Sequence, residues 1–360
     1  MQDGYIATDD VKTLRVGASS VDRFRLKRGD VLLTEGGDFD KLGRGAVWDG
    51  RIDPCLHQNH VFRVRCFQAE LIPDFLALYM ASPEGRAYFL QIAKQTTNLA
   101  TISSSQLKAM PVPYLPAVEQ RRIVEAAHAV DAAVRSAEAL IAKFRSVRQG
   151  LLLDSCASVV SAAPANGWER MPLGEVVPSV EYGISESLDR DPRGTPVLRM
   201  NNLQGGKVDL EDLRYYSGAV PRRVLLQRGD VLFNRTNSID HVGKAGIWQG
   251  QFPDATFASY LVRLNINIDR IIPEYLVEWL MHPVIRRRLR AISTVAVQQV
   301  NVNPTRLRDL EIDMPADLSE QRKITAALSA CDDEINREAS RYAKLRTVRQ
   351  GLMRDLISGR

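Results

Sequence analysis

The chain has 360 residues, of which 45% are hydrophobic and 25% charged, and it carries a net charge of +5. This length predicts two or three domains with full hydrophobic cores, and the composition is typical of a globular protein. Because the sequence has no apolar run of roughly 18 residues and no signal-peptide pattern, we expect no membrane partner and a cytoplasmic location. The basic charge is compatible with a polyanionic partner, but many basic proteins bind no nucleic acid.

Two parts of the chain, 200 residues apart, have nearly the same sequence. Arg28-Gly29-Asp30-Val31-Leu32 recurs as Arg228-Gly229-Asp230-Val231-Leu232. Further along the offset becomes 201, and Glu119-Gln120-Arg121 recurs as Glu320-Gln321-Arg322. A repeat of this size is too long for a solenoid unit and indicates a duplicated domain.

In chain order, the pattern predicts a mixed segment, a long helix, a second mixed segment and a second long helix. The first mixed segment has short apolar runs separated by Gly-Gly and Asp-Pro, which is typical of strands and turns. A shorter helix is predicted from Asp74 to about Ser82, and its counterpart follows Pro273, since proline suits the first turn of a helix. Each Arg-Gly-Asp triplet is interpreted as a turn before a buried strand, with glycine permitting positive φ.

The two long helices have apolar residues spaced alternately four and three apart, which is a heptad pattern. Each helix of about 38 residues would be roughly 57 Å long and could not bury its apolar stripe alone. The simplest partner is the other copy, and a two-fold relation would make the two helices antiparallel. The alternative is that each helix lies on its own domain. The predicted partner-binding residues are Ile123, Val130, Val134 and Ile141 in the first helix and Ile324, Leu328, Ile335 and Leu345 in the second.

These patterns predict an α+β fold. It has two mixed α/β units separated by two long antiparallel coiled-coil helices, in a pseudo-two-fold repeat. The predicted boundaries are residues 1–116 for the first unit, 117–157 for the first long helix, 158–166 for a linker, 167–317 for the second unit and 318–358 for the second long helix.

Motifs for catalysis are mostly absent from the sequence. It has neither a GxxxxGK[ST] phosphate loop nor the adenine-methylating signature of Asn or Asp, two prolines and an aromatic residue. His57 and His60 are spaced like zinc ligands but lack a second ligand pair, which favours a polar turn over a metal site. We therefore predict a binding protein that is not an enzyme, with no metal or cofactor of its own.

Residues 228–238 leading into Gly243-Lys244, together with the two Glu-Gln-Arg motifs, resemble the specificity subunit of type I restriction-modification enzymes. Gly167-Trp168-Glu169 is similar to that family's opening of a target-recognition domain. The resemblance covers nearly the whole chain. It implies that each mixed unit is a target-recognition domain reading half of a split double-stranded DNA site, and that the paired helices set the separation of the two readers.

The resemblance also implies partners and cofactors outside this chain. Modification subunits would carry S-adenosylmethionine and methylate adenine, and a restriction subunit would act as translocase and nuclease, so ATP and Mg²⁺ are expected on the partners. The alternative is a truncated remnant that acts only as a protein scaffold for modification subunits. Residues 1–6 align best with residues 203–208, so the counterpart of residues 167–202 is absent and the first domain is expected to be incomplete at its N-terminus.

The two copies differ most at residues 34–38 and 234–238, and unlike loops on a shared framework suit two readers of different half-sites. Asn and Gln side chains can pair bidentately with adenine, and Arg with guanine, in the major groove. The alternative is that these polar residues cap turns. The candidate DNA contacts are Asn234, Arg235, Thr236, Asn237, Ser238, His241, Lys244, Gln298, Gln299 and Asn301 in the second unit and Lys41, Arg44 and Asn98 in the first. Arg286, Arg287, Arg288 and Arg290 either clamp phosphates or form the solvated face of a helix.

Overall fold

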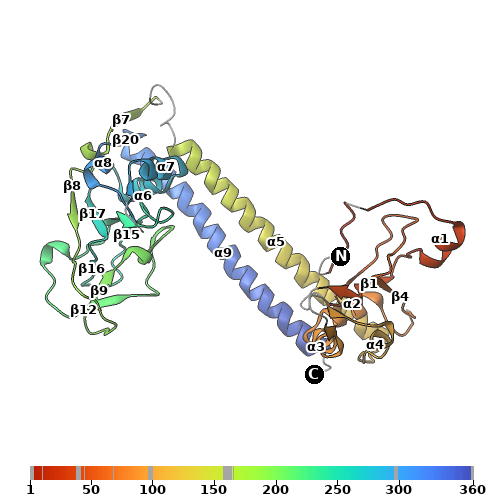
Figure 1. The fold of residues 1–360 in the computed structure, drawn as a ribbon. Coiled ribbons are helices and arrows are strands. Elements are labelled where there is room, and N and C mark those ends of the chain that lie inside the picture. The colour runs from red at the N-terminus through yellow and green to blue at the C-terminus, as the bar shows by residue number, and fades with distance from the viewer. Residues whose placement is uncertain are drawn as a thin grey trace. The chain divides into compact units, whose positions relative to one another are not determined.

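The computed structural model describes residues 4–9, 11–37, 42–43, 45–67, 69–95, 100–156, 164, 166–295 and 299–357. Unit 1 comprises Met1–Leu140 and Arg337–Arg360, and unit 2 comprises Ile141–Asn336. The long helices α5 (Ala117–Cys156) and α9 (Leu318–Ile357) have 40 residues each. Each unit contains a part of both long helices (Figure 1).

Unit 1 contains a three-stranded antiparallel sheet in the order β3-β1-β4 and a small second sheet in the order β2-β6-β5. Helix α2 packs on the first sheet, and its buried residues Leu76 and Tyr79 join Val31 and Leu33 of β1 in one core. The elements are α1 (Ala18–Phe24), β1 (Val31–Thr34), β2 (Gly36–Gly37), β3 (Gly45–Val47), β4 (Val61–Val64), α2 (Pro73–Ala81), α3 (Pro83–Ile92), β5 (Lys94–Gln95), β6 (Ala100–Thr101) and α4 (Ser104–Lys108).

Unit 2 is larger and contains a six-stranded sheet in the order β10-β11-β15-β13-β17-β8. Two three-stranded sheets, β12-β9-β16 and β14-β19-β18, and the pair β20-β7 complete it. Its strands are β7 (Trp168–Pro172), β8 (Ser179–Tyr182), β9 (Thr195–Leu198), β10 (Leu203–Gln204), β11 (Gly206–Val208), β12 (Arg214–Tyr216), β13 (Val231–Asn234), β14 (Thr236–Asn237), β15 (Ala245–Ile247), β16 (Thr256–Phe257), β17 (Leu261–Asn265), β18 (Thr294–Val295), β19 (Val300–Asn301) and β20 (Glu311–Pro315). Its shorter helices are η3 (Leu173–Glu175), η4 (Met200–Asn202), η5 (Arg222–Val224), α6 (Pro273–Met281), α7 (Pro283–Ala291) and α8 (Pro304–Arg308).

The sheets of the two units share one strand order and register. Strand β1 lies between β3 and β4 as β13 lies between β15 and β17, and Val31 pairs with Val47 where Val231 pairs with Ile247. The predicted mixed α/β character of both units is confirmed. The short helices predicted after residues 73 and 273 are confirmed as α2 and α6, each beginning at proline. The sequence analysis did not identify α3 as a helix.

Both Arg-Gly-Asp triplets form turns before a buried strand, as predicted. Gly29 and Gly229 have φ values of 91° and 95°, in the region that favours glycine. In each triplet the aspartate, Asp30 or Asp230, accepts a hydrogen bond from the backbone N–H three residues earlier. It also pairs with an arginine on or just after the neighbouring strand. Each triplet therefore links the turn before an interior strand to the neighbouring strand.

The repeated Glu-Gln-Arg motif places a buried glutamine at the start of each long helix. The side-chain oxygen of Gln120 accepts a hydrogen bond from the N–H of Ile72 at 2.8 Å, and that of Gln321 accepts one from the N–H of Ile272 at 3.0 Å. In each case the amide nitrogen donates to two further backbone carbonyls. The glutamine thus joins the start of the long helix to the start of α2 or α6, which accounts for its repetition.

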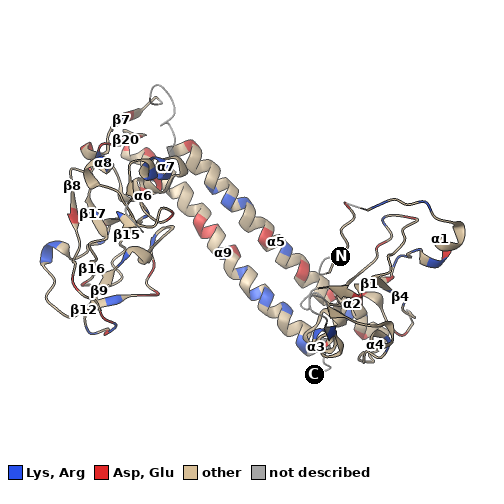
Figure 2. Ribbon diagram, in the orientation of Figure 1, with Lys and Arg blue, Asp and Glu red and all other residues tan. Residues whose placement is uncertain are grey.

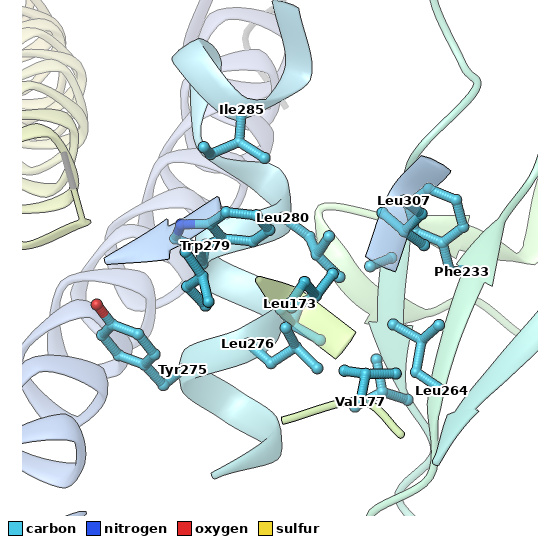
Figure 3. Close-up of a cluster of buried hydrophobic side chains, with 14 of the residues drawn as sticks. Leu173, Val177, Phe233, Leu264, Tyr275, Leu276, Trp279, Leu280, Ile285 and Leu307 are labelled. Atoms are coloured by element: carbon cyan, nitrogen blue, oxygen red, sulfur yellow. The ribbon is translucent and has the colours of Figure 1, made fainter. Parts of the chain in front are cut away.

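The core of unit 2 forms between α6, α7 and the face of the six-stranded sheet (Figure 3). Phe233 and Leu264 extend from the sheet toward Leu276 and Leu280 of α6. The other labelled side chains of this cluster are Leu173, Val177, Tyr275, Trp279, Ile285 and Leu307. Leu152 of α5 and Leu328 of α9 belong to the same cluster, so both long helices are packed into the body of this unit.

The long helices also contact each other through charged residues within each unit. In unit 1, Arg349 forms an ion pair with Asp131. In unit 2, Arg148 pairs with Asp332 at 2.7 Å, and these residues occupy the positions equivalent to Arg349 and Asp131 in the repeat. All eight predicted partner-binding residues are buried or half-buried. Across the described part of the chain, no helix is both long and apolar enough for a bilayer crossing.

Candidate nucleic-acid interface

Two polar segments that lie far apart in the sequence meet in unit 2. Strand β14 pairs antiparallel with β19, so that Thr236 lies opposite Asn301 and Asn237 lies opposite Val300. Strand β18 continues this small sheet on the far side of β19. We call residues 235–243, which contain β14 and the turn after it, the reading loop. The structure thus brings the predicted polar residues of this loop together with those near residue 300.

The candidate residues of unit 2 differ in their exposure. Ser238, His241 and Gln299 are exposed, whereas Arg235, Asn237, Lys244 and Asn301 are half-buried and Asn234 and Thr236 are buried. Asn234 is fully buried, and its amide nitrogen donates to the carbonyl of Met200 at 3.1 Å. Because a fully buried amide cannot reach a base edge, the prediction that Asn234 contacts DNA is wrong. Thr236 is also buried, so we assign it to the support of the loop.

Arg235, at the start of the reading loop, contacts two exposed tyrosines. Its guanidinium carbon lies 5.1 Å from the ring centroid of Tyr182, and its backbone N–H donates to the carbonyl of Tyr260. The two tyrosines are 46% and 44% exposed, so aromatic surface flanks the loop on strand β8 and at the start of β17. The sequence analysis did not identify these tyrosines, because nothing local distinguishes them from core aromatics.

A pocket of about 620 Å³ adjoins the loop and includes Met200 and Tyr260 in its wall. Arg199 and Asn201 in this wall both donate to the carboxylate of Asp212, which holds their side chains in place. The pocket therefore presents fixed polar groups beside the reading loop.

Helix α7 is hydrogen-bonded to the turn of the reading loop. Arg286 of this helix is 8% exposed, and its guanidinium donates to the carbonyls of Val242 and, at 2.9 Å, Asp240. The prediction that Arg286 clamps phosphates or lies on a solvated helix face is therefore wrong. Arg287 and Arg290 of the same helix are exposed, and α7 is among the most basic parts of unit 2 (Figure 2).

Lys244 follows the reading loop and is half-buried. Its ammonium group donates to the side-chain oxygen of Gln204 on β10 at 2.8 Å. Burial lowers the pKa of Lys244, and the nearby charge of Arg286 lowers it further. Burial also lowers the pKa of Arg286, with the charge of Arg290 acting in the same direction. The two cations are therefore close together in a partly desolvated site.

The strand pairing at the start of the reading loop recurs in unit 1 with different side chains. Strand β2 pairs with β6 so that Gly36 lies opposite Thr101, which is the register seen in unit 2. Two glycines thus occupy the positions of Thr236 and Asn237. The candidates Lys41, Arg44, Asn98 and Gln298 lie outside the described residues.

The two histidines with zinc-like spacing contact other groups. The Nδ1 atom of His57 lies 3.1 Å from the carbonyl oxygen of Val61, and that of His60 lies 3.3 Å from the carboxylate of Glu35. These contacts fit the predicted polar turn. Where the structure describes the chain, no group of three or more His, Cys, Asp or Glu side chains could hold a metal ion.

Comparison with known proteins gives a consistent family. Residues 165–346 match the model described as type I restriction modification DNA specificity domain. The chain is 28% identical over 194 residues to the putative type I restriction enzyme MjaX specificity subunit of Methanocaldococcus jannaschii, a match covering 53% of this chain and 45% of that protein. It is 22% identical over 285 residues to the type I restriction enzyme EcoKI specificity subunit of Escherichia coli, covering 73% and 60% respectively. The matches thus span about half of these relatives' length.

Solved structures share the fold. The HsdS subunit from Thermoanaerobacter tengcongensis has a TM-score of 0.51 and 19% identity, over 93% of this chain and 82% of that one. The type I restriction-modification S subunit from M. genitalium has a TM-score of 0.55 and 14% identity, over 93% and 84%. Since the family model matches just over half of the chain and the fold agrees, the chain belongs to the family of type I restriction modification DNA specificity domains.

Proposed function

We propose that this protein is the DNA-recognition subunit of a type I restriction-modification complex. It reads a two-part double-stranded DNA target and directs adenine methylation or restriction by partner subunits, and it catalyses neither reaction itself. One observation carries the proposal: two units with the same sheet register hold unlike side chains at the same loop positions.

The reading loop supplies the chemistry for base recognition. Asn237, Ser238 and Gln299 combine amide and hydroxyl groups on one small sheet and the turns beside it. Amide side chains can pair bidentately with adenine, and hydroxyl groups can bond to several base edges in the major groove. The glycines of unit 1 offer no such groups at the equivalent strand positions, so the two units would read different half-sites.

The long helices support a spacer role. The ion pair between Asp131 and Arg349 in unit 1 has its equivalent in the pair between Asp332 and Arg148 in unit 2, as expected for two antiparallel helices related by a pseudo-two-fold axis. A helix of 40 residues is about 60 Å long at 1.5 Å per residue, which exceeds the roughly 34 Å between half-sites one DNA turn apart. We propose a coiled-coil spacer at residues 117–157 and 318–358, between target-recognition domains at 1–116 and 167–317.

The partners follow from the family. Modification subunits would bind S-adenosylmethionine and methylate adenine, and a restriction subunit would use ATP and Mg²⁺. We propose that these cofactors are bound by the partner subunits. The exposed residues of the long helices would provide the surface for the modification subunits.

The proposal is tested with the full chain, alone and mixed with the modification subunit of the same system. Fluorescence anisotropy with labelled duplexes should show binding that weakens steeply with salt. Methyl transfer from S-adenosylmethionine should require both proteins, and methylation mapping of host DNA with and without the gene should reveal a split target. Methyl transfer by the isolated chain would contradict the proposal. Failure to bind any duplex at low salt would favour the scaffold alternative.

A further inference from the structure

Two cations beside the reading loop form no ion pair with any residue that the structure describes. Arg286 is 8% exposed and uses its guanidinium to hold two loop carbonyls, and Lys244 donates to Gln204. Among the residues that the structure describes, no carboxylate lies within ion-pair distance of Lys244 or Arg286, since neither forms any of the ion pairs found. Neutral acceptors satisfy the hydrogen bonds of both cations. The charge of Asp240 offsets part of the charge of Arg286, whereas no carboxylate of the described residues acts on Lys244.

A positive charge that is removed from water and forms no ion pair raises the free energy of the site. Removing a cation from water without an opposite charge disfavours its ionised form, which is the direction in which the pKa values of Lys244 and Arg286 are shifted. An anion that binds beside them would recover this cost. A DNA phosphate is such an anion, and it accepts hydrogen bonds readily from a lysine ammonium group.

Comparison of the two copies of the repeat distinguishes a phosphate contact from a base contact at these cations. Residues 34–38 and 234–238 differ at every position, yet the positions of Gln204, Lys244 and Arg286 correspond to Gln2, Arg44 and Arg86. A glutamine and two cations thus recur at these sequence positions in both copies, although the residues at 34–38 and 234–238 differ. Contacts that read bases must differ between different half-sites, whereas contacts to phosphates need not.

We propose that Lys244 is a DNA-phosphate contact, oriented by Gln204 and strengthened by the positive charge of Arg286, and that Arg286 is a positioning residue that fixes the reading loop on α7. This inference rests on the proposed function.

The test uses the full chain and a labelled 30-bp duplex of random sequence, roughly three turns of DNA, titrated between about 50 and about 200 mM salt. In Lys244→Gln, the slope of log K against log salt should decrease in magnitude by about 0.9, because one phosphate contact is lost. The affinity at low salt should fall by a similar factor for duplexes of different sequence. Lys244→Arg should retain the slope. Lys323→Gln, which removes an exposed lysine of α9, should leave it unchanged.

An unchanged slope in Lys244→Gln would overturn the inference while leaving the proposed function intact. A loss of affinity confined to one target sequence would also overturn it, because it would indicate a base contact. If the wild-type chain binds no duplex at all, the proposed function fails and this inference fails with it.

A second variant tests the positioning role of Arg286. Arg286→Met should accelerate amide hydrogen exchange of residues 241–243, which the loop hydrogen bonds protect, and should also reduce the salt slope. Lys244→Gln should leave the exchange of these residues unchanged. If Arg286→Met alters neither the exchange nor the slope, the positioning role is wrong.

Discussion

The strand that begins the reading loop of unit 2 and its counterpart in unit 1 pair in the same way and differ in side chains. In unit 2, Thr236 lies opposite Asn301, and in unit 1 Gly36 lies opposite Thr101 in the same register. The backbone pairing recurs although the side chains at these positions differ, so the pairing does not require particular side chains. This fold therefore separates the parts that maintain the structure from the parts that recognise a ligand.

The long helices show a second difference. Arg148 in unit 2 pairs with Asp332 and also with Glu278 of α6, at 2.7 Å in each case. Its equivalent in unit 1, Arg349, pairs with Asp131, and the position corresponding to Glu278 is Leu78. Charged side chains thus link both long helices to α6 in unit 2. Unit 1 has no equivalent link at residue 78, because leucine carries no charge.

The largest expected effect concerns what the two units share. Gln321→Leu and Gln120→Leu should each lower the free energy of unfolding by ~3 kcal/mol, because three backbone groups lose a buried partner. Hydrogen exchange should assign the loss to unit 2 in the first variant and unit 1 in the second. Gln149→Leu, at an exposed position of α5, is the control. A loss of stability shared equally by both units would contradict the assignment of each glutamine to its own unit.

The next prediction compares two glycines of unit 2. A Cβ atom on Gly243 would lie 2.9 Å from a guanidinium nitrogen of Arg286 and 3.0 Å from Leu289, and φ is +78°. At Gly229 φ is +95° but nothing lies within 4 Å. Gly229→Ala should therefore cost only backbone strain, about 1–2 kcal/mol, whereas Gly243→Ala should cost more and weaken DNA binding. Urea unfolding and anisotropy measure the two effects. Equal DNA affinity in both variants would argue against a role of residue 243 in shaping the loop.

The helix ion pairs provide a third test. Arg148→Met leaves Glu278 and Asp332 without their partner in a half-buried site, so unit 2 should lose ~2 kcal/mol of stability. Arg349→Met removes a more exposed pair, and unit 1 should lose less than ~1 kcal/mol. Denaturant unfolding followed by hydrogen exchange distinguishes the units. Similar losses of stability in the two variants would show that the ion pair with Glu278 does not stabilise unit 2.

The fourth prediction concerns recognition by the loop. Asn237→Ala should lower the affinity for the cognate target by about 1–3 kcal/mol and leave binding to random-sequence duplexes unchanged. Among the described residues, the hydrogen bond of this side chain is a local one, accepted from the N–H of Ser238, so the thermal midpoint should stay nearly constant. Equal weakening on all duplexes would assign Asn237 to backbone contacts.

The smallest expected effect is a pH dependence confined to unit 2. Burial raises the pKa of Glu278 above its ordinary value of 4.5, and the attraction of Arg148 only partly offsets this. The folded state then holds this proton more tightly than the unfolded state, so the contribution of Glu278 to stability falls as pH rises above about 4.5 through the raised pKa. The stability of Glu278→Gln relative to the wild type should therefore increase over that range. A difference that is constant with pH would contradict the assignment.

Much of the framework could be predicted from the sequence because its signals are local. The Arg-Gly-Asp triplets require a positive φ at glycine directly before a buried strand, and both turns form as expected. Proline at residues 73 and 273 marks the first turn of a helix, and both helices begin there. The polar composition of the reading loop was also evident, but the exposure of each residue was not. Asn234 has the same local pattern as its neighbours and is nevertheless buried.

The sequence by itself determined the repeat, the long apolar seams and the unlike loops, because these depend only on the order and spacing of residues. Only the tertiary structure decided that β14 pairs with β19, that Tyr182 lies under Arg235, and that the guanidinium of Arg286 donates a hydrogen bond to the loop backbone. Each of these contacts joins residues more than 40 positions apart. Such contacts depend on how strands and helices pack, and no local periodicity records which distant side chain will meet which loop.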